Sequence, residues 1–348
     1  MPYSHRMRTK QRNSGQTGGP GELALLRRIR SRAERTGSAG LRMGIGDDCA
    51  LLRPRAGEEL AVTTDLSIAG RHFRLDWHPP EAVGHRTLAR GLSDLAAMGG
   101  RPVAAFLSLG LPRALTTARG RGRAWVDRFF DGLLALAEMH KTPLAGGDLA
   151  ESPVAVADIV LIGAVPRGRA LLRCGARAGD LLYVTGSMGG AAAALARLGE
   201  LAKDAARPAV PGKRMQAMLA PHLYPQPRLA QGLQLQRRGW ATAALDLSDG
   251  LSTDLAHVCE ESGVAAEVDA AALPVYPGAT LAQALHGGED YELLFTARPG
   301  TRLPRTIAGV PVTQIGRMVA ARAGEAQVRL RTEQGVTALG PHGWEHFS

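Results

Sequence analysis

The residues with the clearest potential for chemistry are carboxylates that recur beside glycine or hydroxyl residues. They lie in short segments in both halves of the chain: Gly44-Ile-Gly-Asp-Asp48, Thr63-Thr-Asp65, Ser93-Asp94, Gly146-Gly-Asp148, Asp246-Leu-Ser-Asp-Gly250 and Gly288-Glu-Asp-Tyr-Glu292. Glycine lets the backbone turn and approach a ligand closely, and carboxylate and hydroxyl oxygens are the ligands that Mg²⁺ prefers. Because no histidine cluster accompanies them, these segments predict magnesium and phosphate chemistry rather than zinc chemistry.

A single Asp beside Gly is more often a turn or a helix cap than a ligand. The recurrence of the pattern, rather than any one segment, therefore indicates a site. Asp94 is the least turn-like of these carboxylates, because it lies within a helical pattern beside Leu95 and two alanines. A carboxylate in that setting needs a partner, and a bound cation would supply one.

A phosphate-binding loop of the GxxxxGK[ST] type is absent from the sequence, since Lys213 is followed by Arg and lacks the loop glycines. The protein-kinase motifs are absent too. Any phosphate would therefore be held by metal ions and backbone amides. Thr185-Gly-Ser-Met-Gly-Gly190 precedes a predicted helix and is a candidate nest of amides, although an ordinary turn into a helix has the same pattern.

The elements that would position these residues alternate between short strand patterns and longer helical ones. Strands are predicted at 60–65, 103–109, 154–165, 181–184, 242–247, 291–296 and 310–316. Helices are predicted from about residue 21, after Gly190, and at 81–98, 124–140, 214–220, 228–238 and 250–262. This mixture predicts an α/β or α+β protein, with a domain boundary near residue 166.

The charge of the chain is distributed unevenly. The 348 residues carry a formal net charge of +10, but residues 1–55 alone hold twelve basic and four acidic side chains. The rest of the chain is nearly neutral, which weakens the case for a nucleic-acid or membrane-surface partner. Residues 1–20 lack apolar periodicity and predict a disordered basic tail.

Features that would direct the protein to a membrane or out of the cell are not found. No apolar run reaches the roughly 18 residues needed to cross a bilayer, and the charged start lacks the apolar segment of a secretory signal. Cys49, Cys174 and Cys259 form no CxxC pair, so neither a disulfide framework nor a cysteine zinc site is predicted. A cytoplasmic location is expected.

The motifs also occur in a characteristic order. They are Gly21-Glu-Leu, GIGDDCALL at 44–52, TTDLSIAGRHF at 63–73, SDLAAMGGRP at 93–102, AGGD at 145–148, RALLRCGARAGDLLYVTGSMGG at 169–190, DLSDGLSTDL at 246–255, GGEDYELLFT at 287–296 and GWEHF at 343–347. Together they resemble the thiamine-monophosphate kinase family, collinearly over about residues 21–347. That family is similar to aminoimidazole ribonucleotide synthetase, selenophosphate synthetase and a hydrogenase maturation protein.

The resemblance implies a two-domain fold of the aminoimidazole ribonucleotide synthetase type. An ATP- and Mg-binding dimerisation domain is expected at 21–165, and a second α/β domain that completes the nucleotide and thiamine sites at 166–348. In that family the N-terminal sheets of two subunits pair, so a homodimer is implied. The implied reaction is direct, in-line transfer of the γ-phosphoryl group of ATP to thiamine monophosphate, which gives thiamine diphosphate and ADP. Because two anionic phosphates must meet, Mg²⁺ can do the main task without a protein base.

The resemblance also implies roles for individual residues, none of them a catalytic base or nucleophile. The implied ATP contacts are Gly147, Asp148, Arg173 and Ser248. The implied substrate contacts are His72, Glu289 and Trp344, of which the last two suit a cationic thiazolium. The implied magnesium ligands are Asp48, Thr63, Thr64, Asp65, Asp94, Asp148, Asp246 and Asp249.

Three residues depart from the family pattern. Leu149 stands where Thr is frequent, and Gly190 and Ala194 stand where Asp and Gly are frequent. None of these departures removes a carboxylate, so activity is expected.

Other functions remain as alternatives. Another ATP-dependent enzyme of the superfamily is the nearest one, but the N-terminal segment lacks the reactive Cys and nearby Lys of selenophosphate synthetases. The chain also ends in Ser348 rather than in the functional cysteine of the hydrogenase maturation protein. A less favoured alternative is a nucleic-acid-binding protein that uses the Arg-rich N-terminus.

Overall fold

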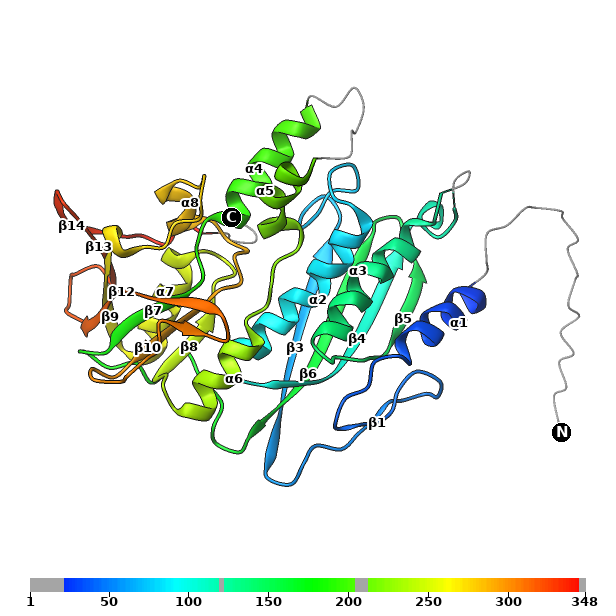
Figure 1. The fold of residues 1–348 in the computed structure, drawn as a ribbon, viewed down its shortest axis with the longest axis horizontal. Helices are drawn as coiled ribbons and strands as arrows, with labels where there is room; N and C mark the ends of the chain where they lie inside the picture. Colours follow the sequence, from blue (N-terminus) through cyan, green and yellow to red (C-terminus); the bar gives the residue numbers. More distant parts are fainter. Residues whose placement is uncertain (1–21, 119–121, 204–211, 344–348) are drawn as a thin grey trace, which may run out of the picture.

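The computed structural model describes residues 22–118, 122–203 and 212–343, which form two domains side by side (Figure 1). Helices and strands are mixed in both, which confirms the predicted α/β (α+β) class. The predicted tail at 1–20 lies outside the described residues. Among the described helices, none is both long and apolar enough to span a membrane.

The N-terminal domain is a four-stranded sheet with helices α2 and α3 on one face (Figure 1). The strand order is β3-β6-β4-β5; β6 runs antiparallel to both of its neighbours, and β5 runs parallel to β4. The elements of this domain are α1 (Glu22–Ala33), β1 (Leu41–Met43), β2 (Leu51–Leu52), β3 (Glu58–Ile68), α2 (Pro80–Ala97), β4 (Arg101–Leu111), the 3₁₀ turn η1 (Arg113–Leu115), α3 (Trp125–Met139), β5 (Leu144–Glu151) and β6 (Val156–Pro166).

The C-terminal domain is a larger sheet of order β14-β13-β9-β12-β7-β10-β8, with β11 paired to β12. Only the β13–β9 pair is parallel among the described pairs of this sheet. Its elements are β7 (Leu181–Thr185), α4 (Gly190–Lys203), α5 (Lys213–Leu223), α6 (Leu229–Arg238), β8 (Ala243–Asp246), α7 (Leu251–Ser262), β9 (Val264–Asp269), η2 (Ala270–Ala272), α8 (Leu281–His286), β10 (Leu293–Ala297), β11 (Thr306–Ile307), β12 (Val310–Ala320), β13 (Val328–Thr332) and β14 (Gly335–Ala338).

Two motif carboxylates lie inside strands, although a strand predicted at 60–65 would end at Asp65 and the two glycines before Asp148 are typical of a turn. Asp65 is within β3, and Asp148 is within β5. The glycines before Asp148 are compatible with a strand because β5 is an edge strand whose pairing with β4 is irregular between Ala105 and Phe106. Gly147 has a φ of +143°, and a Cβ there would lie 1.9 Å from the carbonyl oxygen of Leu107.

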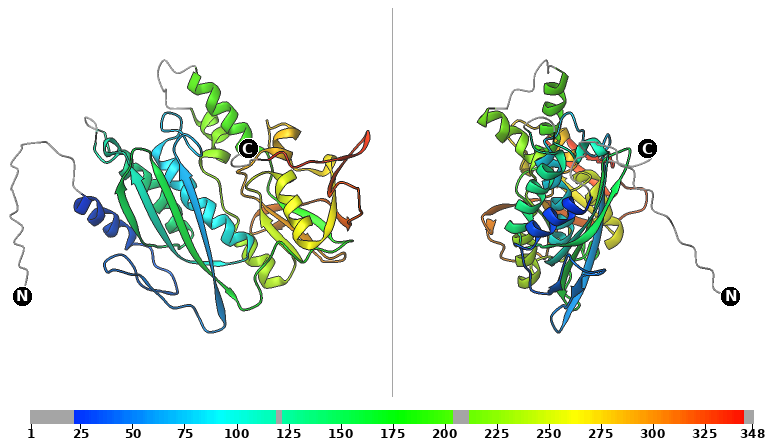
Figure 2. Two further views of the ribbon diagram at one scale, coloured as in Figure 1. Left: turned by 180° about the vertical axis from the view of Figure 1, so that it is seen from behind. Right: turned by 90° about the vertical axis from the view of Figure 1, so that its right-hand side faces the viewer.

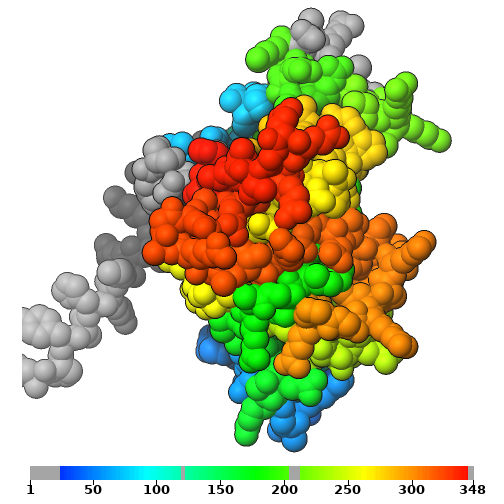
Figure 3. Space-filling view, turned by 90° about the vertical axis from the view of Figure 1, so that its left-hand side faces the viewer, coloured from blue at the N-terminus to red at the C-terminus, as the bar shows by residue number. Residues whose placement is uncertain are grey.

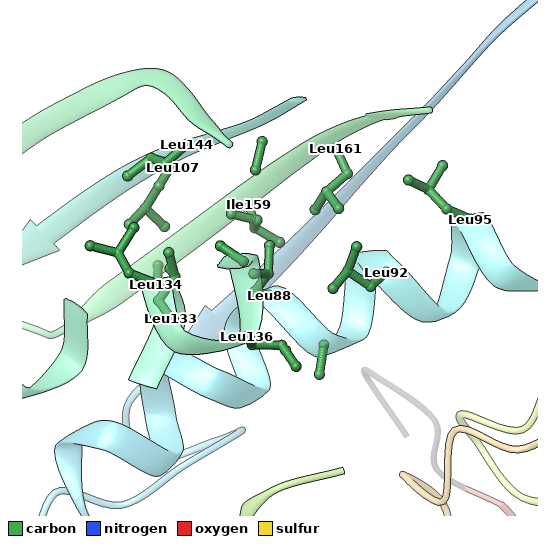
Figure 4. Close-up of a cluster of buried hydrophobic side chains, with 14 of the residues drawn as sticks. Leu88, Leu92, Leu95, Leu107, Leu133, Leu134, Leu136, Leu144, Ile159 and Leu161 are labelled. Atoms are coloured by element: carbon green, nitrogen blue, oxygen red, sulfur yellow. The ribbon is translucent and has the colours of Figure 1, made fainter. Parts of the chain in front are cut away.

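Helix α2 is the central element of the N-terminal domain. Leu88, Leu92 and Leu95 are at most 1 % exposed and share one face because they are three or four residues apart. They pack against leucines of α3 and against Ile159 and Leu161 of β6 (Figure 4). Each buried leucine contributes about 1.5–3 kcal/mol. The same core extends into β8 and β10, so the two domains share one core.

The backbone of α2 lies very close to α3 and α6. A Cβ at Gly84 would lie 1.9 Å from the carbonyl oxygen of Phe129, and one at Gly132 would lie 1.8 Å from that of Glu81. On the C-terminal side, a Cβ at Gly232 of α6 would lie 1.9 Å from the carbonyl oxygen of Ala96. Glycine is required at these crossings, so α2 cannot shift without moving both neighbouring helices.

Replacing Gly84 with Ala should therefore destabilise the fold by about 1–3 kcal/mol, the usual cost of overpacking a core. Denaturant unfolding followed by circular dichroism measures the free energy of unfolding. The matched control is Gly199→Ala in α4, where a Cβ would make ordinary contacts with Trp77 and better helix propensity should preserve or raise stability. Equal stability of Gly84→Ala and the wild type would contradict the tight crossing.

Candidate functional site

A cavity of about 410 Å³ lies between the two domains. Its walls come from β3 and the 70–78 segment, from α2, from the start of α4, from His222 near the end of α5, and from the segments 246–249 and 288–291. Carboxylates, arginines and histidines line it, with apolar surface from Phe73, Trp77 and Leu195. Polar groups from distant parts of the sequence therefore converge on one space.

Arg86, Arg90 and Asp94 lie on one face of α2 on successive turns, since they are four residues apart, and Arg90 and Asp94 line this cavity. The Arg86 side chain is 5 % exposed, and its Nη2 donates to Oε1 of Glu289. Arg90 Nη2 lies 2.6 Å from Oδ1 of Asp65. Two of the three α2 side chains thus hold carboxylates that belong to other segments.

Asp94 and Asp246 are buried carboxylates that influence each other. Asp94 accepts a hydrogen bond from the Thr63 hydroxyl, and Asp246, at the end of β8, accepts one of 2.6 Å from Ser93 Oγ. Burial raises the pKa of Asp94 above its ordinary value. Burial and the charge of Asp94 raise the pKa of Asp246 to about 7, and burial raises that of Asp65 to about 6. A cation placed among these groups would stabilise their ionised forms.

The donor set fits Mg²⁺ whose coordination is completed by other ligands. Within the described ranges, no three His, Cys, Asp or Glu side chains lie close enough to hold a metal ion by themselves. Mg²⁺ usually keeps several waters and is bound by one or two carboxylates plus substrate phosphates. Asp65, Asp94 and Asp246 offer carboxylate oxygens of this kind, and Asp249 lines the same cavity.

Glu289 lies in the wall of the cavity with both carboxylate oxygens engaged. Arg86 donates to Oε1, and Nδ1 of the buried His222 lies 3.3 Å from Oε2. Burial by itself raises the pKa of Glu289, but these two partners lower it by a larger amount. The resulting pKa is well below the usual range of a glutamate. Glu289 has a φ of +71°, a conformation that is unusual outside glycine. The carboxylate is therefore ionised and held in one orientation.

The glycine-rich run before α4 does not form an open phosphate nest, which corrects the prediction made for residues 185–190. Asp290 fills this position: its Oδ2 accepts a hydrogen bond of 2.6 Å from the Gly189 N–H, and its Oδ1 accepts one of 3.0 Å from the Ala191 N–H. A carboxylate at a helix N-terminus satisfies free N–H groups and the helix dipole. The amides are thus used to hold the 288–292 segment.

Three predicted magnesium ligands lie away from the acidic cavity. Thr64 points to the opposite face of β3 from Asp65, and its hydroxyl donates to Asp158 at 3.1 Å. Asp48 and Asp148 line a second cavity of about 450 Å³, between α1, β5 and the 44–50 loop. Gly147 is in the same row of the sheet as Asp65, three strands away, which corresponds to about 14 Å.

Of the remaining predicted residues, those that the structure describes lie at or near the first cavity. His72 and Ser248 line it. The charge of Arg173 lowers the pKa values of Asp94 and Asp246. Trp344 lies outside the described residues. The Gly343 N–H, just before it, donates to Thr253 Oγ1 of α7 at 3.0 Å. In the space-filling view, the red C-terminal part of the described chain lies on the surface beside yellow residues of the same domain (Figure 3).

The sequence did not single out Arg86, Arg90, His78 or His222, which lie in or beside the wall of this cavity. Arg86 and Arg90 precede Asp94 at a spacing of four, and that spacing was the available signal. His78 and His222 gave no signal, because they are 144 residues apart, yet their Nε2 atoms lie 2.9 Å from each other. Arg86 Nη1 contacts Nδ1 of His222 at 3.0 Å.

Comparison with known protein families identifies the class of protein to which the two domains belong. The family described as AIR synthase related protein, N-terminal domain, matches residues 46–165, and its C-terminal domain counterpart matches residues 177–329. This protein thus has the two domains of that class.

Similarity to individual proteins identifies the family more narrowly than the two domain matches do. The chain is 38% identical over 340 residues to the thiamine-monophosphate kinase of Escherichia coli (strain K12), with 94% of this chain and 98% of the relative covered. A crystal structure of thiamine-monophosphate kinase from Stenotrophomonas maltophilia K279a is 38% identical with a TM-score of 0.75, covering 89% of this chain and 96% of that one. AaThiL complexed with AMPPCP and TMP is 30% identical with a TM-score of 0.70, covering 94% and 97%. The chain belongs to the thiamine-monophosphate kinase family.

Replacing Asp290 with Asn should lower the free energy of unfolding by about 1–3 kcal/mol, because one of the two N–H groups at the start of α4 would lose its acceptor. Thermal and denaturant unfolding measure this loss. The control is Asp269→Asn, which alters an exposed cap of η2 and should change stability by less than about 1 kcal/mol. Wild-type stability of the Asp290 variant would contradict the role assigned to this carboxylate.

Proposed function

We propose that this protein is a thiamine-monophosphate kinase, which transfers the γ-phosphoryl group of ATP to the phosphate of thiamine monophosphate and forms thiamine diphosphate and ADP. The observation that carries the proposal is a single cavity that joins the acidic wall of Asp65, Asp94 and Asp246 to the fixed carboxylate of Glu289. The relatives named above, and the AMPPCP and TMP bound by AaThiL, support the same pair of substrates.

The reaction brings two anionic phosphate groups together, so charge neutralisation and alignment are its main requirements. We propose that Mg²⁺ is held by Asp48, Thr63, Thr64, Asp65, Asp94, Asp148, Asp246 and Asp249. Bound Mg²⁺ would neutralise phosphate charge and align the reacting oxygens. The raised pKa values of Asp65 and Asp246 support such a role for these carboxylates.

We assign the two substrates to different groups of residues. Gly147, Asp148, Arg173 and Ser248 are the proposed ATP contacts, and His72, Glu289 and Trp344 the proposed thiamine contacts. Arg86 already neutralises Glu289, so this carboxylate would act mainly as a hydrogen-bond acceptor of fixed orientation.

We also propose a homodimer formed through the N-terminal sheets. The face of the sheet opposite α2 and α3 has no covering helix among the described residues (Figure 2). Leu60, Val62 and Leu66 of β3 point outward on this face and are 45%, 63% and 45% exposed. Apolar patches of this kind mark interaction sites, and a second copy would cover the patch.

A dimer would also explain the separation of the two cavities. Gly147 and Asp148 are three strands from Asp65 in one chain, about 14 Å, which is too far to share a phosphate chain of ATP with it directly, and Asp48 lines the same second cavity as these two residues. The partner's copies of these residues could approach β3 across the sheet-to-sheet contact. The complete site would then contain residues of two chains.

The kinase proposal predicts a specific product. With ATP, Mg²⁺ and thiamine monophosphate, the wild type should form thiamine diphosphate, which chromatography detects. Asp94→Asn should reduce turnover by roughly 100-fold or more, the size typical when one group that stabilises charge is lost, with the fold intact by circular dichroism. Asp127→Asn, which alters a surface pair with Arg28, is the control. A folded, ATP-binding wild type that yields no thiamine diphosphate would refute the proposal.

The shared site predicts complementation between inactive subunits. Asp94→Asn and Asp148→Asn proteins should each be nearly inactive, but a mixed dimer has one of its two sites with both carboxylates intact. It should have about half of wild-type activity, and an equal mixture of randomly paired subunits about a quarter. Light scattering checks that the proteins are dimers. Adding Val62→Glu to both variants should prevent dimers and abolish the recovery. Failure of mixed dimers to recover activity would show that each site belongs to one chain.

Two smaller proposals concern the surroundings of the enzyme. We propose a cytoplasmic location, supported by three cysteines that are all unpaired. The nucleic-acid-binding alternative predicts salt-sensitive binding that is lost when residues 1–20 are deleted, without any formation of thiamine diphosphate. No feature of the described residues favours it over the kinase.

A further inference from the structure

We infer that Arg90 binds the phosphate group of the acceptor substrate directly, as a cationic contact additional to any metal ion. This inference rests on the function proposed above and extends it to a residue that the motifs did not mark. Phosphate is well matched by a guanidinium group, which offers several N–H donors in a planar fork.

The position of Arg90 on α2 is the first observation. Arg86, one turn earlier, holds Glu289 at the proposed thiamine end of the cavity, and Asp94, one turn later, belongs to the acidic wall. One helical turn is about 5.4 Å, so Arg90 lies between the two ends. In thiamine monophosphate the phosphate group connects the thiazolium part to the incoming phosphoryl group, and it must occupy this middle region.

The hydrogen bonds of Arg90 are the second observation. Nη2 pairs with Oδ1 of Asp65 at 2.6 Å, and Nη1 donates to Ser67 Oγ at 3.1 Å. Nε is buried and has no hydrogen-bond partner within the part of the chain that the structure describes. A buried donor without an acceptor is costly. A phosphate oxygen would satisfy it after a small movement of the side chain.

Two other cationic side chains near the cavity, Arg86 and Arg74, are less suited to this contact. Arg86 is fully engaged by Glu289 and His222. Arg74 lies on the exposed 70–78 segment, stacks on Trp77 and pairs with Asp76. Arg90 is 16% exposed and held on a buried helix, so it is already oriented before the substrate arrives and loses little entropy on binding.

The test compares two ligands that differ only in the phosphate. Isothermal titration calorimetry with Mg²⁺ and without ATP gives the affinities of the full-length wild type and of Arg90→Gln for thiamine monophosphate and for thiamine. Arg90→Gln should bind thiamine monophosphate about tenfold or more weakly, as expected for a lost hydrogen bond to a charged group. Its affinity for thiamine should stay within about twofold of wild type.

Two further variants complete the design. Arg128→Gln in α3, which breaks a pair with Glu81 of α2 outside the cavity, should leave both affinities unchanged. Arg90→Lys keeps the charge beside Asp65 but lacks the planar fork. The ratio of its affinity for thiamine monophosphate to its affinity for thiamine should therefore be a few fold lower than that of the wild type. Arg90→Lys replaces Arg90→Gln if that variant does not fold.

The possible outcomes separate this inference from the proposed function. An unchanged ratio of the two affinities in the Arg90 variant would overturn the inference, as would an equal loss for both ligands, which would indicate that Arg90 only holds Asp65. A wild type that binds thiamine no more weakly than thiamine monophosphate would also overturn it. A wild type that binds neither ligand would contradict the kinase proposal itself.

Discussion

A charged or hydroxyl side chain buried on α2 must find a partner, because an unpaired polar group in the protein interior is strongly destabilising. Arg86 and Ser93 find theirs, Glu289 and Asp246, in the C-terminal domain. Separating the domains would leave these groups without partners as well as exposing a shared apolar core. Docking of the domains and assembly of the cavity are therefore one event, and α2 is the element that couples them.

Helix α2 is held rigidly because the sides that do not face the cavity are tightly packed against neighbouring elements. Its leucines are buried against the sheet and α3, and its backbone meets α3 and α6 at glycine crossings that leave no room for a side chain. A helix fixed in this way can hold charged groups at defined distances along its remaining face. Such preorganisation is what a reaction between two phosphates requires, since the energy gained comes from placing opposite charge accurately rather than from a reactive side chain.

The acidic motifs predicted where the site lies, but they did not predict the role of each carboxylate. In the 288–292 segment, Glu289 faces the cavity, Asp290 holds the start of α4, and Glu292 pairs with Arg228. Positive φ values at Glu289 and Tyr291 turn the backbone so that neighbouring side chains diverge. A sequence pattern records that carboxylates are present, while their direction depends on backbone angles that tertiary contacts impose.

The sequence by itself determined the α/β class, most of the helices and strands, and the family, because periodicity and local motifs depend on neighbouring residues. It also indicated Asp65, Asp94, Asp246 and Glu289 as residues of one site. Only the tertiary structure decided that Asp48 and Asp148 lie at a second cavity, that the glycine run is filled by Asp290, and that arginines of α2 hold the carboxylates in place. These are contacts between residues up to 203 positions apart, which burial and charge pairing select only once the chain is folded.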